Sequence, residues 1–271
     1  MEGGLSMGHL GEPKYLSYCF EEAYVAKTLK KMKKNGLAVI DSDGIRASTV
    51  HTAVDRGVMV YDYLNVGALE RERSFYAKFK HLRLAEYEGW PGEFWIDPTS
   101  NEWKQHLYDA AREKKTKGAI GLYVDNGDIL WMAKSGFREE NSRMLRSAPS
   151  AMAVYNALLD IFTTLTFDLG LICMPNGADL LVRQMFADGY GKSLIKTINQ
   201  EGCIFEDFKK QSKSEMDYRT AYMLWALRHG LYVRGIEYAK SSSDISKAKK
   251  YYEKHGFQGL YISSHTDLRG D

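Results

Sequence analysis

The hydrophobic positions of this chain fall into short runs that alternate with longer stretches. The short runs are rich in β-branched and aromatic residues, whereas the longer stretches space their apolar residues as helices do. Strands and helices in this order form a parallel sheet covered by helices. The predicted strands are eight: Tyr15–Cys19, Leu37–Ile40, Val58–Leu64, Ile120–Val124, Leu171–Met174, Thr197–Cys203, Leu231–Ile236 and Leu260–Ser263.

Glycine marks the predicted ends of the helices. It tolerates the left-handed conformation that satisfies the last helical carbonyls. Helix starts are indicated by side-chain oxygens, with Ser100 or Asn101 before residues 102–117 and Ser214 before residues 215–229. The glycines that close a helical pattern just before a strand are Gly36, Gly57, Gly118, Gly170, Gly230 and Gly256.

This pattern predicts a single-domain α/β protein, a (β/α)₈ TIM barrel built from eight strand–helix units. The 271 residues suit one such barrel, and no Pro- or Ser-rich linker divides them. An open, doubly wound sheet is the alternative. We expect residues 1–13, which are rich in glycine, to form a flexible N-terminal segment and residues 14–271 to form the barrel.

Composition narrows the classes of partner. The 37 Lys and Arg nearly balance the 35 Asp and Glu, so no field strong enough to gather nucleic acid is expected. The longest apolar runs are far shorter than the roughly 20 residues of a membrane span, and the N-terminus lacks the pattern of a secretory signal peptide. Cys19, Cys173 and Cys203 are widely spaced and set among apolar residues, which indicates buried free thiols.

Polar and acidic side chains follow most of the predicted strands. In a TIM barrel the active site lies where the strands end, so these segments are expected to converge around one mouth. The residues are Asp41 and Asp43 after strand 2, Asn65 and Glu70 after strand 3, Asp125, Asn126 and Asp128 after strand 4, Asn176 after strand 5, Glu201 on strand 6, and Glu237 and Tyr238 on strand 7.

Two of these acids stand out from the others. Taken singly, Asp43, Asp128 and Asn176 are more typical of turns and helix caps than of a binding site. Asp125 and Glu201 instead follow or interrupt apolar strand runs, where a carboxylate is costly unless it is paired or used. These two are therefore the predicted catalytic pair.

The sequence lacks the motifs of zinc hydrolases, serine hydrolases and nucleotide-binding proteins. The sequence has no HExxH, CxxC, GxSxG, Walker or GxGxxG pattern, and its seven histidines fall mainly in helices or near the termini. We therefore predict no metal site and no cofactor.

The order of several short motifs resembles glycoside hydrolase family 114, the endo-α-1,4-polygalactosaminidases, over roughly residues 39–263. Each motif is weak alone, and their order and spacing are specific. The matching residues are Gly67, Glu70 and Arg73, Trp90-Pro91-Gly92, Trp95-Ile96-Asp97, the run from Gly121 to Asp125-Asn126-Gly127-Asp128, Asn176-Gly177, Glu201 with Phe205, and Glu237-Tyr238-Ala239.

Two positions depart from the family pattern or leave it open. Ala68 stands where the family has the first glutamate of its strand-3 motif. The strand-6 segment can also be aligned with Glu206 as the second catalytic acid in place of Glu201.

The resemblance implies a hydrolase of α-1,4-linked galactosamine-containing polysaccharide that uses two carboxylates and retains the anomeric configuration. Asp125 would be the nucleophile, Glu201 the acid/base, and Arg73 a residue that orients a carboxylate. The mouth would bind a cationic amino sugar, and the protein would act outside the cell. A non-catalytic sugar-binding barrel and a hydrolase of another α-glycan are the alternatives. The expected substrate-binding residues are Asp41, Asp43, Tyr63, Asn65, Glu70, Arg73, Asp97, Asn126, Asp128, Asn176, Glu237 and Tyr238.

Overall fold

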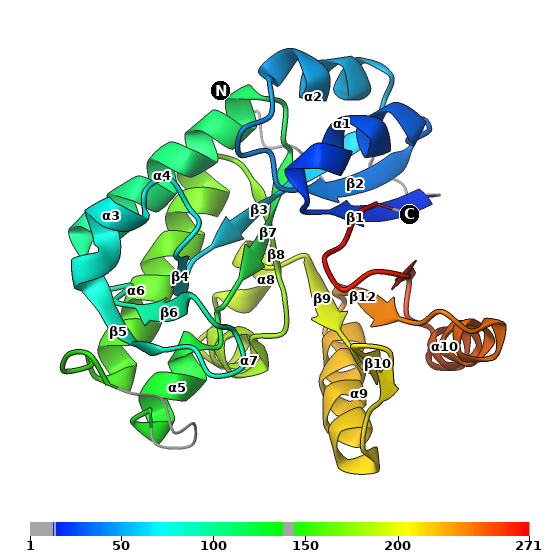
Figure 1. Ribbon diagram of the computed structural model, residues 1–271. Coiled ribbons are helices and arrows are strands. Elements are labelled where there is room, and N and C mark those ends of the chain that lie inside the picture. Colours follow the sequence, from blue (N-terminus) through cyan, green and yellow to red (C-terminus); the bar gives the residue numbers. More distant parts are fainter. Residues whose placement is uncertain (1–12, 14, 138–143, 271) are drawn as a thin grey trace.

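The computed structural model describes Pro13, residues 15–137 and residues 144–270, so the predicted flexible segment lies outside the described residues except for Pro13. Strands lie at the centre of the fold and helices lie around them (Figure 1). All eight predicted strands are present, within a few residues of their expected bounds. They are β1 (Tyr15–Cys19), β2 (Gly36–Ile40), β3 (Met59–Asn65), β7 (Gly121–Asp125), β8 (Ile172–Pro175), β9 (Thr197–Glu201), β12 (Tyr232–Tyr238) and β13 (Gly259–Ser263).

These strands form a parallel barrel in chain order. One ladder joins β1, β2, β3, β7 and β8, and a second joins β9, β12 and β13. Between β8 and β9 the connection is made by bridges, and the N of Gly177 donates to the O of Asn199 at 2.9 Å. β13 returns next to β1, where the rings of Tyr18 and Tyr261 lie 5.4 Å apart. The predicted (β/α)₈ fold is therefore confirmed.

Helices connect the strands on the outside of the barrel. Each barrel strand except the last, β13, is followed by at least one helix before the next barrel strand begins. The helices are α1 (Glu22–Lys31), α2 (Ala47–Asp55), α3 (Tyr76–Phe79), α4 (Asn101–Thr116), α5 (Ile129–Ser135), α6 (Ala151–Thr163), α7 (Asp179–Ala187), α8 (Gly191–Leu194), α9 (Lys213–Arg228) and α10 (Ser242–His255), with a short 3₁₀ helix at Lys80–Leu82 and a π-helical turn at Thr164–Asp168.

Two insertions lengthen the connections at the mouth. A three-stranded antiparallel sheet, in the order β4-β6-β5, lies between β3 and α4. A two-stranded hairpin follows β9. The inserted strands are β4 (Ala68–Glu70), β5 (Arg83–Glu86), β6 (Glu93–Ile96), β10 (Phe205–Glu206) and β11 (Lys209–Lys210).

The prediction of eight complete strand–helix units is wrong in its last unit. In the part of the chain that the structure describes, no helix follows β13. The C-terminal residues instead return to the first strand, where the N of Phe20 donates to the O of Leu268 at 2.9 Å. This segment covers the seam between β13 and β1.

Two details of the helix ends also differ from expectation. Five of the six predicted glycines have positive φ, but at the end of α1 the left-handed residue is Asn35 (φ 63°) and Gly36 already belongs to β2. The helix α9 begins at Lys213, two residues earlier than predicted, since the Ser212 side chain, and not that of Ser214, accepts a hydrogen bond from the N of Glu215. The left-handed conformation at position 35 suits asparagine, which is among the non-glycine residues that take it most readily.

The cores on the two sides of the sheet differ in chemistry. Aliphatic residues mixed with Phe and Trp fill the space between strands and helices, whereas tyrosines are prominent in the interior of the barrel, among them Tyr18, Tyr61, Tyr123 and Tyr261. All three cysteines are buried and free, as predicted. None of the helices in the described ranges is long and apolar enough to span a membrane.

Candidate active site

Asp125 is the last residue of β7, and the residue as a whole is partly exposed. Three uncharged donors hold it. The Nδ2 of Asn176 and the backbone N of Asn126 lie 3.2 and 3.0 Å from Oδ1, and the Tyr63 hydroxyl lies 3.1 Å from Oδ2. Within the described residues, Asp125 makes no ion pair.

A close approach between two loops fixes the position of Asp125. A Cβ atom on Gly67 would collide with the backbone O of Asn126, so only glycine fits there without a shift of the backbone. The neighbouring Val66 N donates to the O of Asp125 at 3.1 Å. The segment after β3 is thereby held against the end of β7.

Glu201 ends β9 and meets Asp125 through one shared donor. The Nδ2 of Asn176, which lies 3.2 Å from Asp125, also lies 3.1 Å from the Oε2 of Glu201. The Tyr238 hydroxyl donates to the other carboxylate oxygen of Glu201. An amide NH₂ group has two hydrogens, so Asn176 can serve both carboxylates at once.

Asn199, which sequence reasoning missed as a site residue, orients Asn176. Its Nδ2 donates to the Oδ1 of Asn176 at 2.8 Å, and its own Oδ1 accepts from the Tyr18 hydroxyl at 2.8 Å. Residues two apart on a strand face the same side, so the position of Asn199 two residues before Glu201 was the signal that could have revealed it.

The surroundings of the pair favour its protonated forms. Burial raises the pKa of Glu201 to about 7; the hydrogen bonds from Tyr238 and Asn176 oppose this shift, and the neighbouring Asp125 adds to it. Burial also raises the pKa of Asp125, against the effect of its three hydrogen bonds. A proton is therefore held more tightly at both groups than on an ordinary carboxylate.

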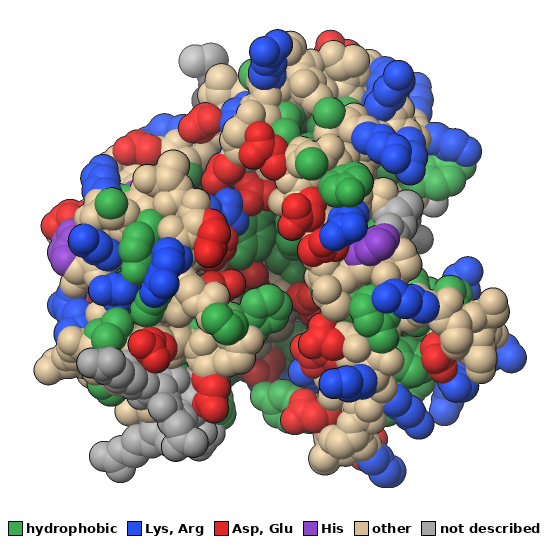
Figure 2. Space-filling view, viewed as in Figure 1, with side chains coloured by type: hydrophobic (Ala, Val, Ile, Leu, Met, Phe, Trp, Pro, Cys, Tyr) green, Lys and Arg blue, Asp and Glu red, His purple; other side chains and the backbone are tan. Residues whose placement is uncertain are grey.

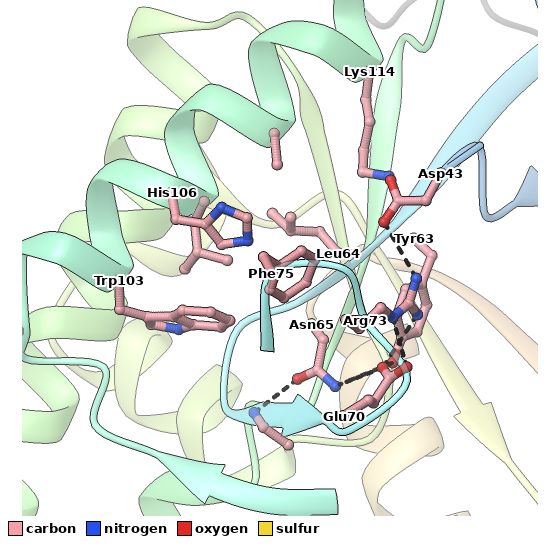
Figure 3. Close-up of a pocket in the computed structure, with 13 residues that line it drawn as sticks. Asp43, Tyr63, Leu64, Asn65, Glu70, Arg73, Phe75, Trp103, His106 and Lys114 are labelled. Carbon is pink, nitrogen blue, oxygen red and sulfur yellow. Dashed lines mark hydrogen bonds and ion pairs between the residues drawn. The ribbon is translucent and has the colours of Figure 1, made fainter. Parts of the chain in front are cut away.

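A second group of acids at the mouth is neutralised by cations. Arg73 lies 2.6 Å from Asp41, 2.6 Å from Glu70 and 3.2 Å from Asp43. Lys114, on α4, lies 2.8 Å from Asp43. Figure 3 shows Arg73 between Glu70 and Asp43, with Lys114 reaching Asp43 from the helix. Lys114 is thus a second cation beside Arg73, and sequence reasoning missed it.

Lys114 extends this network into the barrel wall. Its buried ammonium also lies 3.2 Å from the Oδ1 of Asp62, which is fully buried and accepts from the N of Ser42 at 3.0 Å. Burial lowers the pKa of Lys114, but the carboxylates around it outweigh that effect and raise it. This arrangement links α4 to β3 and to the segment that follows β2.

Tyr63 and Asn65 join the two groups of acids. The Tyr63 hydroxyl lies 3.3 Å from the Oε1 of Glu70 as well as 3.1 Å from Asp125. Asn65 donates to the Tyr63 hydroxyl at 3.2 Å and to Glu70 at 3.4 Å. The position of Asp125 thus depends indirectly on the Arg73 network.

Glu237 and Asp97 are occupied by local contacts. Glu237 is fully buried and accepts hydrogen bonds from the N of Ile204, the N of Phe205 and the Tyr252 hydroxyl, at 2.7 to 3.2 Å. Asp97 is buried, accepts from Thr99 and lies 3.4 Å from Arg146. We therefore do not expect Glu237 or Asp97 to contact a sugar.

Asn126, Asp128 and Glu206 lie around the pair without completing it. Asn126 is buried and accepts from the Tyr87 hydroxyl at 3.2 Å. Burial and the nearby Asp179 raise the pKa of Asp128 to about 7. Glu206 points to Arg219, at 3.0 Å, so the described contacts join Asp125 to Glu201 and not to Glu206.

Glu93 is a further acid that sequence reasoning missed. It stands opposite Glu70 in the β4–β6 ladder. Burial raises its pKa to about 8, and the charges of Glu70 and Asp125 add to the shift. Its place directly after the matched Trp90-Pro91-Gly92 motif was the available signal.

The acids gather around a hollow at the centre of one face (Figure 2). Beside it, Ala68 lines a cavity of about 30 Å³ together with Glu70, Arg73 and Lys114. A volume of that size holds water and not a sugar. A search of the described residues finds no group of His, Cys, Asp and Glu placed to hold a metal ion.

A carboxylate pair at the C-terminal mouth of a (β/α)₈ barrel is the arrangement with which glycoside hydrolases cleave sugar bonds. Fold and site together define that class. The chain belongs to glycoside hydrolase family GH114, whose family model matches residues 14–268.

Three similar proteins illustrate the relationship. The glycoside hydrolase domain of PelA from Pseudomonas aeruginosa has a TM-score of 0.75 at 15% identity, with 96% of this chain and 98% of that chain covered. Aspergillus fumigatus Ega3 in complex with galactosamine has a TM-score of 0.66 at 17% identity, with 94% and 91% covered. An uncharacterised protein of Thermotoga maritima is 26% identical over 256 residues, which are 87% of this chain and 76% of that protein.

Proposed function

We propose that this glycoside hydrolase cleaves α-1,4-linked galactosamine-containing polysaccharide with retention of configuration, with Asp125 as nucleophile and Glu201 as acid/base. The observation that carries the proposal is the shared donor Asn176. Both carboxylates lie within about 3.2 Å of its Nδ2, so their nearest oxygens are closer together than the roughly 6.5 Å at which the range for inverting enzymes begins.

The two steps use the carboxylates in turn. Protonated Glu201 gives its proton to the glycosidic oxygen while a carboxylate oxygen of Asp125 bonds to the anomeric carbon, and the carbon–oxygen bond to the leaving sugar breaks. Water then attacks the anomeric carbon, gives its proton to Glu201 and releases Asp125. The raised pKa of Glu201 suits the first step, since it keeps the acid protonated near neutral pH.

A cationic sugar fits the acids that have no cation in contact. Arg73 and Lys114 neutralise Asp41, Asp43 and Glu70, whereas no ion pair with a described residue is formed by Asp125, Glu201, Glu93 or Asp128. An ammonium group on the substrate would pair with ionised Asp125 and would lower the raised pKa values of Glu93 and Asp128. The galactosamine in the Ega3 complex is consistent with such a ligand.

The test is product release from fully deacetylated and N-acetylated α-1,4-galactosaminoglycan at two salt concentrations, with a neutral α-glycan and the Asp125→Asn protein as controls. We expect the deacetylated polymer to be cleaved best, and its cleavage to weaken as salt rises, because opposite charges are screened over about 8 Å at physiological ionic strength. Equal cleavage of both polymers without salt dependence would instead favour a neutral glycan.

A further inference from the structure

The hairpin that follows β9 ends in an unusual tip. Asp207 and Phe208 join β10 to β11, and both have left-handed backbones, with φ of 48° and 63°. Two-residue hairpin turns of this kind prefer Gly and Asn, since a side chain is strained there. A phenylalanine held in this conformation is kept by its surroundings, and such residues cluster at ligand clamps.

Phe208 lies next to the acid Glu201. Its ring packs edge-on against Tyr238, with centroids 6.2 Å apart, and the Tyr238 hydroxyl donates to Glu201. The Nζ of Lys240 lies 3.9 Å from the centroid of the Phe208 ring. Lys240 is exposed, and within the described residues its ammonium makes no ion pair or hydrogen bond.

We propose that the face of Phe208 is a binding subsite for the ammonium of a substrate sugar, and that Lys240 occupies this face until the substrate displaces it. The inference rests on the proposed function. Since Glu201 protonates the leaving oxygen, the sugar bound at Phe208 is the unit on the leaving-group side of the scissile bond. An exposed cation–π contact is weak, so the Lys240 ammonium can return to water when a sugar ammonium replaces it. An N-acetylated unit carries no charge and cannot make this exchange.

The test measures binding by calorimetry in the Asp125→Asn protein, which prevents turnover. The ligands are an α-1,4-galactosamine hexamer and its N-acetylated form. Phe208→Leu removes the aromatic face and keeps an apolar side chain; Lys240→Met removes the competing ammonium and keeps the stem. Lys249→Met, on an exposed position of α10, is the control for loss of one positive charge.

We expect Phe208→Leu to weaken binding of the deacetylated hexamer about two- to fivefold when Lys240→Met has removed the competing ammonium, and less when Lys240 is present. Lys240→Met should tighten it more than Lys249→Met does, and should have no such effect once Phe208 is replaced. Neither substitution should change binding of the acetylated hexamer. The melting temperature of each variant shows that it is folded.

Unchanged affinity when Phe208→Leu is added to Lys240→Met, weaker binding in Lys240→Met alone, or equal effects on the acetylated ligand would each overturn the subsite. If the unmodified protein cleaves the deacetylated polymer while the double variant binds it as tightly as Lys240→Met does, only the subsite is wrong. If the unmodified protein cleaves none, the proposed function and the subsite fail together.

Discussion

The two sides of the barrel mouth hold the same kind of side chain in opposite ways. On the β2–β3 side, burial works to raise the pKa of Asp43, yet Lys114 and Arg73 outweigh it and hold that pKa below its usual value. On the β7–β9 side, the partners of Asp125 and Glu201 are amides and hydroxyls, and burial raises both pKa values. Cationic partners keep an acid ionised and structural, whereas neutral donors leave it able to exchange a proton.

Removal of ionisation on the β7–β9 side should have the largest effect. Asp125→Asn and Glu201→Gln keep the size of each side chain, so each protein should fold and lose kcat by a factor of about 10³ or more. Turnover of the deacetylated polymer measures this. Glu206→Gln is the matched control, because that acid faces Arg219 and should tolerate the change. Full activity in Glu201→Gln would move the acid/base role elsewhere.

On the β2–β3 side, removal of the Lys114 ammonium should lower the free energy of unfolding. Lys114→Met leaves Asp62 buried without its partner, and breaking such a pair costs about 3–5 kcal/mol of unfolding free energy. Urea denaturation measures the change. Lys104→Met removes a pair with the exposed Asp160 and should cost less than about 1 kcal/mol. Similar losses in both variants would contradict the distinction between the two sides.

The pH dependence should show the raised pKa of Glu201. Since the acid must be protonated, kcat/KM should fall about tenfold per pH unit above about 7. The acidic limb, where Asp125 gains a proton, should lie above the ordinary 3.8. The folded-state pKa of Glu201 exceeds its ordinary 4.5, so its contribution to stability is complete below 4.5 and is lost as pH rises through about 7.

Initial rates across the pH range measure the two limbs, and urea unfolding at about pH 5 and about pH 8 measures the linkage. In Glu201→Gln, the difference in unfolding free energy between the two pH values should be smaller by the contribution of Glu201. A rate that stays flat to about pH 9 would contradict the assignment of Glu201 as the acid.

The smallest effect is expected at Asn199. Asn199→Ala frees the amide of Asn176 to rotate, and should lower kcat about tenfold with little change in KM, because the residue acts on the pair and not on substrate. Restored activity in Asn199→Gln is not expected, since the longer side chain cannot keep the 2.8 Å contact in place. A change confined to KM would mean that Asn199 contacts the sugar.

The strands and the acids at their ends could be predicted because periodicity and strand-end placement are local signals. The partners of those acids could not. Lys114 lies among the charged residues at the end of α4, a pattern typical of a solvated face, and its burial follows from how that helix packs on Asp62. Glu237 lies at a strand end as predicted, but the turn after β9 folds over it and takes up its oxygens.

Asn176 has a consequence for how this chemistry could change over evolution. The gap between the two carboxyl groups is set from β8, a strand that supplies neither of them. A side chain one methylene longer at position 176 would hold the two carboxyl groups farther apart, with neither acid replaced. Under the proposed mechanism, the stereochemical outcome would then depend on the length of one amide side chain as well as on the two acids.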